Sequence, residues 1–91
     1  MKIEVDSKSY EVKNFEVNCF ITCVKVRFDF VDFDNFCASH IFGYPITTKK
    51  DAKDIIVYED DGHVSKICVC LLEGISENGV DLVADWMYQI K

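Results

Sequence analysis

Apolar and polar residues alternate along most of the chain, and this alternation predicts a protein built mainly from β-strands. Ile3 and Val5 alternate with charged residues, and after a polar turn at residues 6–9 the alternation resumes at Tyr10. Because successive side chains of a strand point to opposite faces, this pattern predicts a β-hairpin near the N-terminus.

The apolar positions between residues 15 and 31 change parity once. Apolar residues occupy the odd-numbered positions 17, 19, 21 and 23 and then the even-numbered positions 24, 26, 28 and 30. One face of a strand holds one parity, and the segment is too long for a single flat strand. We therefore predict a bulge at Cys23–Val24, or a bend at which one strand serves two packing surfaces.

A helical period replaces the alternation at about residues 33–42. Side chains recur there at i, i+3, i+4, i+7 and i+8, which is the spacing of an amphipathic helix. Asp32 or Asp34 can accept hydrogen bonds from the first free backbone amides, and Gly43 followed by Pro45 can end the helix. The stripe expected to face the core comprises Phe33, Phe36, Cys37, His40 and Ile41.

Three further strands are predicted in the C-terminal half. Residues 55–58 and 64–72 flank an Asp-Asp-Gly sequence that is a strong reverse-turn signal. Residues 67–72 are apolar at both parities, which predicts that both faces of that strand are covered. In residues 80–90, six alternating apolar positions favour a strand, although a helix can also be drawn through the segment.

The summed order is β-β-β-α-β-β-β in one domain spanning residues 1–91, because this length suits a single domain. The economical architecture is an α+β fold: a mainly antiparallel β-sheet or partly rolled barrel, with one short helix covering an end or a face. Apolar residues make up 49% of the chain, which is enough for a core without metals or disulfide bonds.

Charge is distributed unevenly along the chain, whose net charge is −6. Residues 1–27 hold five basic and four acidic side chains, whereas residues 28–91 hold five basic and twelve acidic ones. Nucleic acids and anionic membranes attract basic surfaces, so we expect no direct nucleic-acid binding and no membrane binding. A protein partner with a basic surface fits better, because complementary potentials speed encounter and select partners.

The five cysteines are odd in number and lie among apolar neighbours. Secreted disulfide frameworks usually have an even number of cysteines in loops, so we expect buried, reduced thiols and a cytoplasmic, reducing compartment. The first residues show no signal-peptide pattern, and the longest apolar run, residues 67–72, is too short to cross a bilayer.

Candidate catalytic and metal-binding groups are few, and each has a simpler structural interpretation. Cys37 and His40 are three residues apart and His63 follows, but zinc-site spacings are absent and packed thiols explain the pattern better. Residues 59–62 share the acidity of a calcium loop but not its regular ligand spacing. The sequence therefore predicts no catalytic residue, no metal site and no cofactor.

The most unusual segment is residues 28–36, in which four phenylalanines and three aspartates interleave. Phenylalanines that supply core area and aspartates that face solvent explain most of it, and Asp29 is the aspartate that folding explains least. Exposed acids remain available to a partner. The predicted partner-binding residues are Asp29, Asp32, Asp34, Glu59, Asp60 and Asp61.

The leading hypothesis is a non-catalytic protein-binding module, an inhibitor or adaptor that docks an acidic face on a basic partner surface, such as one that holds nucleic acid. The first alternative is a structural subunit that self-associates through sheet edges into a homo-oligomer or larger assembly, by analogy with small viral and mobile-element proteins. The second alternative is a small thiol- or metal-dependent enzyme.

Overall fold

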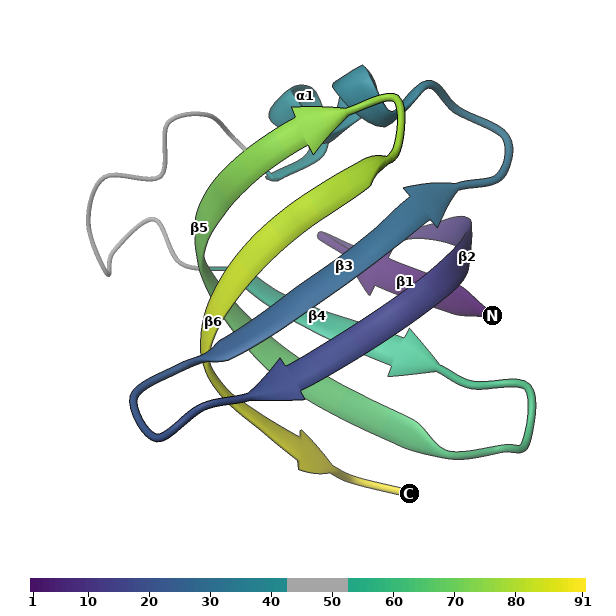
Figure 1. Cartoon of the computed structure of the whole chain (residues 1–91). Coiled ribbons are helices and arrows are strands. Elements are labelled where there is room, and N and C mark those ends of the chain that lie inside the picture. Colours follow the sequence, from purple (N-terminus) through teal and green to yellow (C-terminus); the bar gives the residue numbers. More distant parts are fainter. Residues whose placement is uncertain (43–52) are drawn as a thin grey trace.

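Six antiparallel strands and two short helical turns make up the part of the chain that this computed structural model describes, residues 1–42 and 53–91. The elements are β1 (Lys2–Val5), β2 (Lys8–Cys19), β3 (Val24–Phe30), the 3₁₀ turn η1 (Asn35–Cys37), α1 (Ala38–Phe42), β4 (Lys53–Tyr58), β5 (Val64–Ser76) and β6 (Gly79–Gln89). The strands close into a barrel in the order β1–β2–β3–β6–β5–β4, and β4 pairs back with β1 (Figure 1).

The predicted architecture is confirmed at the level of element types and their order. The fold is mainly antiparallel sheet with one short helix between the third and fourth strands. Residues 80–90 fall almost entirely in β6, so the strand prediction is confirmed there and the helix is wrong. The predicted helix end at Gly43 and Pro45 lies outside the described residues. Among the helices that the structure describes, none is long and apolar enough to span a membrane.

Three bent strands divide the barrel into two sheets that cross (Figure 1). The first half of β2 pairs with β1, and its second half pairs with β3. In the described part of the chain, β5 pairs with β4 over residues 64–69 alone, and β6 pairs with β3 over residues 80–84 alone. The bent strands are β2, β5 and β6, and the shifts in pairing register lie along them. Such bulges allow a strand to bend from one sheet into a second sheet that crosses it.

The bend of β2 lies at Asn14 and not at Cys23–Val24, where the parity change predicted it. The register between β2 and β3 shifts around Asn14, whose φ is 54°. Asparagine adopts this left-handed conformation more readily than most residues. Residues 20–23 instead form a tight turn, in which the backbone N–H of Phe20 donates to the carbonyl of Cys23. The parity changes there because two different strands meet.

A second irregularity, at Asp85, reverses the faces of β6. Two consecutive pairs between β5 and β6 skip Asp85, which has no partner on β5. Even-numbered residues up to Ala84 are buried, but Trp86 and Tyr88 beyond the bulge are 38% and 47% exposed. The six alternating positions therefore do not form one buried face, and the last part of β6 carries its aromatic side chains on the outside.

The core fills the space between the two sheets and reaches α1. Phe28 is fully buried, and its ring centroid lies 5.2 Å from that of Phe30 and 6.3 Å from that of Phe42. These rings join β3 to α1. The prediction that both faces of residues 67–72 are covered is wrong at Leu71, which is 40% exposed.

The helical segment turns a different face to the core from the one that its spacing predicts. Phe33 and Phe36 of the predicted stripe are 48% and 55% exposed, and His40 is exposed as well. Helical structure begins only after Asp34, whose carboxylate accepts a hydrogen bond from the backbone N–H of Phe36. Asp34, rather than Asp32, is thus the capping residue. The buried residues of η1 and α1 are Asn35, Ala38 and Phe42.

Truncation of Phe28 should destabilise the protein far more than truncation of Phe36. We expect Phe28→Ala to lower the free energy of unfolding by about 3–5 kcal/mol, the usual cost of removing a buried phenylalanine ring. Phe36→Ala should change it by less than about 0.5 kcal/mol, because surface substitutions have small effects. Urea unfolding followed by circular dichroism measures both, and equal losses would contradict the exposed position of Phe36.

Candidate functional site

The segment from Phe28 to Phe36 is the junction between β3 and the helical turns. Phe28 and Phe30 lie in the core, as predicted, whereas Phe33 and Phe36 reach the surface. The ring of Phe33 packs edge to face against Tyr10 and Phe30, with centroid distances of 5.7 and 6.3 Å. The end of β3 therefore presents exposed aromatic groups beside its acids.

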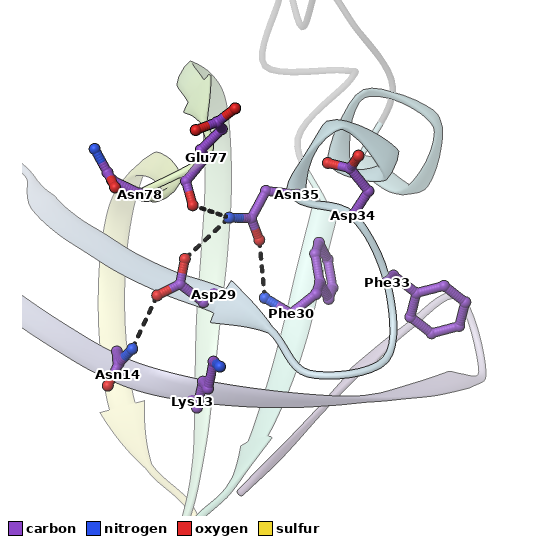
Figure 2. Close-up of a pocket in the computed structure, with 9 residues that line it drawn as sticks. All are labelled: Lys13, Asn14, Asp29, Phe30, Phe33, Asp34, Asn35, Glu77 and Asn78. Carbon is purple, nitrogen blue, oxygen red and sulfur yellow. Dashed lines mark hydrogen bonds between the residues drawn. The ribbon is translucent and has the colours of Figure 1, made fainter.

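Asn35, which the sequence patterns did not single out, is the polar centre of this junction (Figure 2). Its side-chain oxygen accepts a hydrogen bond from the backbone N–H of Phe30, and its amide nitrogen donates to the carboxylate of Asp29, both at 2.9 Å. The same nitrogen lies 3.1 and 3.3 Å from the carbonyl oxygens of Ser76 and Glu77. Asn35 is 8% exposed, and a buried amide is tolerated when its polar atoms are paired in this way.

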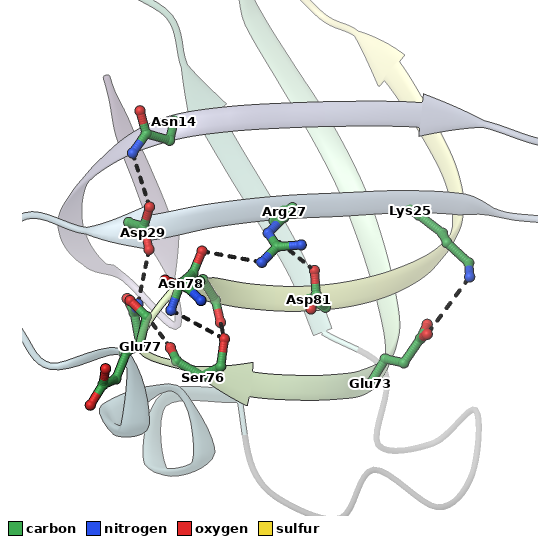
Figure 3. A network of polar contacts seen from close by, with 11 residues as sticks. Asn14, Lys25, Arg27, Asp29, Glu73, Ser76, Glu77, Asn78 and Asp81 are labelled. Carbon is green, nitrogen blue, oxygen red and sulfur yellow. Dashed lines mark hydrogen bonds and ion pairs between the residues drawn. The ribbon is translucent and has the colours of Figure 1, made fainter.

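Asp29 has an internal role, which corrects the prediction that folding explains it least. Its carboxylate accepts hydrogen bonds from the side chains of Asn14, at 3.0 Å, and Asn35 (Figure 3). These two bonds, that of Asn14 first, hold the pKa of Asp29 below its ordinary value, because they favour the charged form. Asp29 thereby connects the bulge of β2 to the junction.

A pocket of about 570 Å³ opens over this network (Figure 2). Phe33 lines it on one side, and the other lining groups are mostly polar, among them Lys13 and Glu77. The side chains of Asp29 and Asn35 already bond to each other, and Asn35 also bonds to the backbone. The network therefore occupies the side chains of Asp29 and Asn35, and the pocket offers a ligand the side chains of Lys13, Glu77 and Asn78.

The basic side chains of β3 are paired with acids on β5 and β6 (Figure 3). Lys25 lies 3.7 Å from Glu73, and the Nε of Arg27 lies 3.7 Å from Asp81. Arg27 also donates to the backbone carbonyl of Asn78 at 3.2 Å. Exposed pairs of this kind add little stability, but they balance the charge of this side of the barrel.

The second acidic segment is the turn between β4 and β5. Gly62 closes it with a φ of 94°, a conformation that favours glycine. The carboxylate of Asp61 accepts a hydrogen bond from the backbone N–H of His63 at 3.0 Å and contacts a ring nitrogen of His63 at 2.6 Å. These contacts, the backbone bond first, lower the pKa of Asp61. Asp60 lies 2.9 Å from the amino group of Met1.

Glu59, Asp61 and His63 are the one group of three potential metal ligands among the described residues, with ligand atoms within 4.8 Å of one another. Structural zinc sites use four protein ligands. Asp61 and His63 already bond to each other within the turn. Turn geometry explains the cluster, and nothing else about it points to an ion.

Both acidic segments lie on one side of the barrel, the right side in Figure 1, although they are far apart in the sequence. The backbone N–H of Val31 donates to the carbonyl of Glu11, and that of Val12 donates to the carbonyl of Met1. Met1 in turn contacts Asp60, so a continuous set of contacts through β2 and β1 links the end of β3 to the end of β4. We call the acids of these two segments the acidic rim: Asp32, Asp34, Glu59, Asp60 and Asp61.

Cys68 and Cys70, the two thiols of β5, are poor nucleophiles. Burial first, and then the carboxylate of Asp54, raises the pKa of the Cys68 thiol. Burial and the carboxylate of Asp85 raise the pKa of Cys70 in the same way. The thiolate is the reactive form, so neither residue is activated for catalysis.

Comparison with protein-family models, curated proteins and solved structures finds no significant match to the chain. Function therefore has to be argued from geometry and charge. The fold gathers five of the six sequence-predicted binding residues into the acidic rim and binds the sixth, Asp29, into the internal network. The sequence patterns did not predict the network residues Asn14 and Asn35. The one signal for Asn35 was its polar side chain at the start of the predicted helix, between Asp34 and Phe36.

Asn14→Gly should raise the pKa of Asp29 towards its ordinary value, because the hydrogen bond that lowers it most is lost while glycine keeps the positive φ. The folded-state pKa is lowered, so the charged group stabilises the fold above the ordinary pKa. This contribution is lost as the pH falls through the lowered value. An NMR titration of the Asp29 carboxyl carbon checks the shift, and identical midpoints in both proteins would disprove the assigned bond.

Asn35→Ala should lower the free energy of unfolding by about 1–3 kcal/mol, because the buried N–H of Phe30 and two backbone carbonyls lose their partner. Asn78→Ala is the matched control, since Asn78 uses backbone atoms in its contacts and its side chain is exposed. Chemical unfolding of both variants measures the difference. A loss in the control as large as that in Asn35→Ala would argue against a special role for the buried amide.

Proposed function

We propose that the protein is a non-catalytic protein-binding module, an inhibitor or adaptor, whose acidic rim docks on a basic surface of its partner. The observation that carries the proposal is the position of two separate acidic segments on one side of a closed barrel. A partner surface that otherwise holds nucleic acid fits this charge best, because carboxylates in series can occupy the positions of phosphates.

The acidic rim is accessible to a partner. The side chains of Asp60 and Asp61 are 89% and 59% exposed, and Asp32 and Asp34 are exposed as well. Exposed acids on one side of the molecule steer a basic partner towards that side, and salt weakens this attraction.

Basic groups near the acidic rim are fewer than its acids. Lys2 lies opposite Tyr58 at the end of β4, and Lys13 lies opposite Asp29 near the end of β3. The amino group of Met1 offsets Asp60. Among the residues that the structure describes, five acids against these three positive groups leave this side of the barrel negative.

The fold also holds several rim carboxylates in fixed orientations. Asp34 caps η1, and Asp61 accepts a hydrogen bond from the backbone of His63. A pre-oriented group loses less conformational entropy when it binds, which favours recognition over a mobile acidic tail. Asp29 is omitted from the proposed surface because Asn14 and Asn35 occupy its carboxylate.

Two alternatives differ in the support that they receive. Self-association is supported by a strand edge at residues 86–89 of β6, beyond the last pair between β6 and β3. A thiol- or metal-dependent enzyme gains no support from Cys68 and Cys70, whose pKa values are raised, or from the contacts of the β4–β5 turn.

Charge reversal on the acidic rim should abolish partner capture. The variant Asp32→Lys, Glu59→Lys, Asp60→Lys spares Asp34 and Asp61, whose carboxylates bond to the backbone. We expect basic nucleic-acid-binding proteins to be retained from a lysate by the native protein, to be released by added DNA, and to bind the variant at least about tenfold more weakly. Mass spectrometry identifies the retained proteins, and calorimetry with a purified one measures the affinity.

The matched control is Glu16→Lys, Glu73→Lys, Asp81→Lys, which changes the net charge equally but lies on the side of the barrel formed by β2, β3, β5 and β6. This control should bind like the native protein or more weakly by only a small factor. If the rim variant retains the same proteins at the native level, or if both variants lose them equally, the proposed docking surface is wrong.

A further inference from the structure

The C-terminal half of β6 continues past the start of β3 and leaves one strand edge open. The last pair between these strands joins Val24 to Ala84. Beyond it, β5 is the one described strand that pairs with β6, over residues 86–89 (Figure 1). The other edge of residues 86–89 has no described strand beside it. An edge of this kind presents backbone N–H and C=O groups that can pair with a further strand.

The outward side chains at this edge are large and apolar. Trp86 and Tyr88 stack with their ring centroids 5.0 Å apart and an angle of 24° between the rings. They are 38% and 47% exposed, and Ile90, which follows on the same side, is 49% exposed. The bulge at Asp85 produces this exposure, because it turns the even-numbered residues from the core to the outside.

Within residues 1–42 and 53–91, the edge lacks the features that usually protect a strand edge from pairing. Natural proteins place charges or proline on open edges, or cover them with another segment. Residues 86–90, with the sequence Trp-Met-Tyr-Gln-Ile, contain neither a charged residue nor proline. An uncharged aromatic strand with one free edge is therefore suited to adding a strand.

We propose that a second copy of this chain occupies the edge through antiparallel pairing of β6 with β6, so that the sheet of β4, β5 and β6 continues into the second copy. A strand that pairs with itself makes every contact twice about a two-fold axis, which closes the assembly at a dimer. An axis through Tyr88 places Trp86 opposite Ile90 of the second copy, and Asp85 opposite its Lys91. Apolar and oppositely charged cross-strand pairs both favour this register.

The chain has a net charge of −6, so two copies repel each other over most of their surfaces. The strip beside this edge is an exception, because its charges offset each other. On the outer face beside the edge, Lys66 lies 3.4 Å from Asp54, so the two charges offset each other. Asp85 and Lys91 offset each other across the proposed interface. Two copies therefore meet along a neutral strip, whereas the basic partner proposed for the acidic rim finds no excess of acid here.

Sedimentation velocity from about 1 µM to about 1 mM tests the proposal, since this range covers weak to moderate dimers. We expect a concentration-dependent dimer and slowed hydrogen exchange of the Met87 and Gln89 amides as it forms, because the N–H of Ile90 already donates to Val64 of β5 and alternate residues direct their N–H groups to the other edge. Tyr88→Lys should raise the dissociation constant at least about tenfold. Asp85→Lys alone should also weaken the dimer, and the double variant Asp85→Lys, Lys91→Asp should restore it.

Tyr58→Lys is the control, because Tyr58 is 41% exposed on the same outer face but lies on β4, which has a strand on each side. Edge pairing predicts a native dimer in this variant, and a loss equal to that of Tyr88→Lys would indicate face-to-face packing and overturn the proposal. A strict monomer at about 1 mM would overturn it too, and failure of the charge exchange to restore the dimer would overturn the Tyr88-centred register. The rim variant Asp32→Lys, Glu59→Lys, Asp60→Lys should dimerise normally, so this test is independent of the proposed function.

Discussion

The hydrogen bonds of one buried amide, that of Asn35, hold together the end of β3, the bulge of β2 and the β5–β6 turn. The first acids of the rim, Asp32 and Asp34, depend on this arrangement. Through the N–H of Phe30 this amide fixes the end of β3, and through Asp29 it reaches Asn14 in the bulge of β2. Through the carbonyls of residues 76 and 77 it also holds the turn between β5 and β6. The chain leaves β3 for the helical turns at this point, so the direction in which the first acids of the rim point follows from these bonds.

Bulges set the positions of both proposed surfaces, and they do so in different ways. At Asn14 the bulge bends β2 from one sheet to the other and supplies the side chain that binds Asp29. At Asp85 the bulge moves Trp86 and Tyr88 from the inside of the barrel to the outside. One extra residue in a strand turns the side chains that follow it to the opposite face. A small closed barrel can therefore present two surfaces of different chemistry, the acidic rim and the apolar edge of β6.

Alternation along the sequence predicted six strands in their order along the chain, because burial of one face imposes a period of two on any strand, but it assigned residues 15–31 to one bent strand that the structure divides between β2 and β3. It could not distinguish a bulge from a turn between two strands at Cys23–Val24, since both change the parity by one. Helical spacing was compatible with more than one starting residue, and the cap at Asp34 decides which face is buried. The charge of the rim was visible in the sequence, but its two segments lie on one side of the barrel because β1 pairs with both β2 and β4. The partners of Asp29 are set by tertiary structure.

Strand β1 is the shortest of the barrel, and its pairing has a consequence for the order in which the protein folds. Lys2 lies opposite Glu11 of β2 on one side and opposite Tyr58 of β4 on the other. The first pairing closes a short loop, whereas the second brings together segments from opposite halves of the chain, and the entropy lost on loop closure rises with loop length. Folds dominated by distant pairings form in roughly milliseconds to seconds, more slowly than helical bundles. During synthesis on the ribosome, β1 can pair with β2 soon after both are made, but it gains its second neighbour only after residues 53–58 have been added.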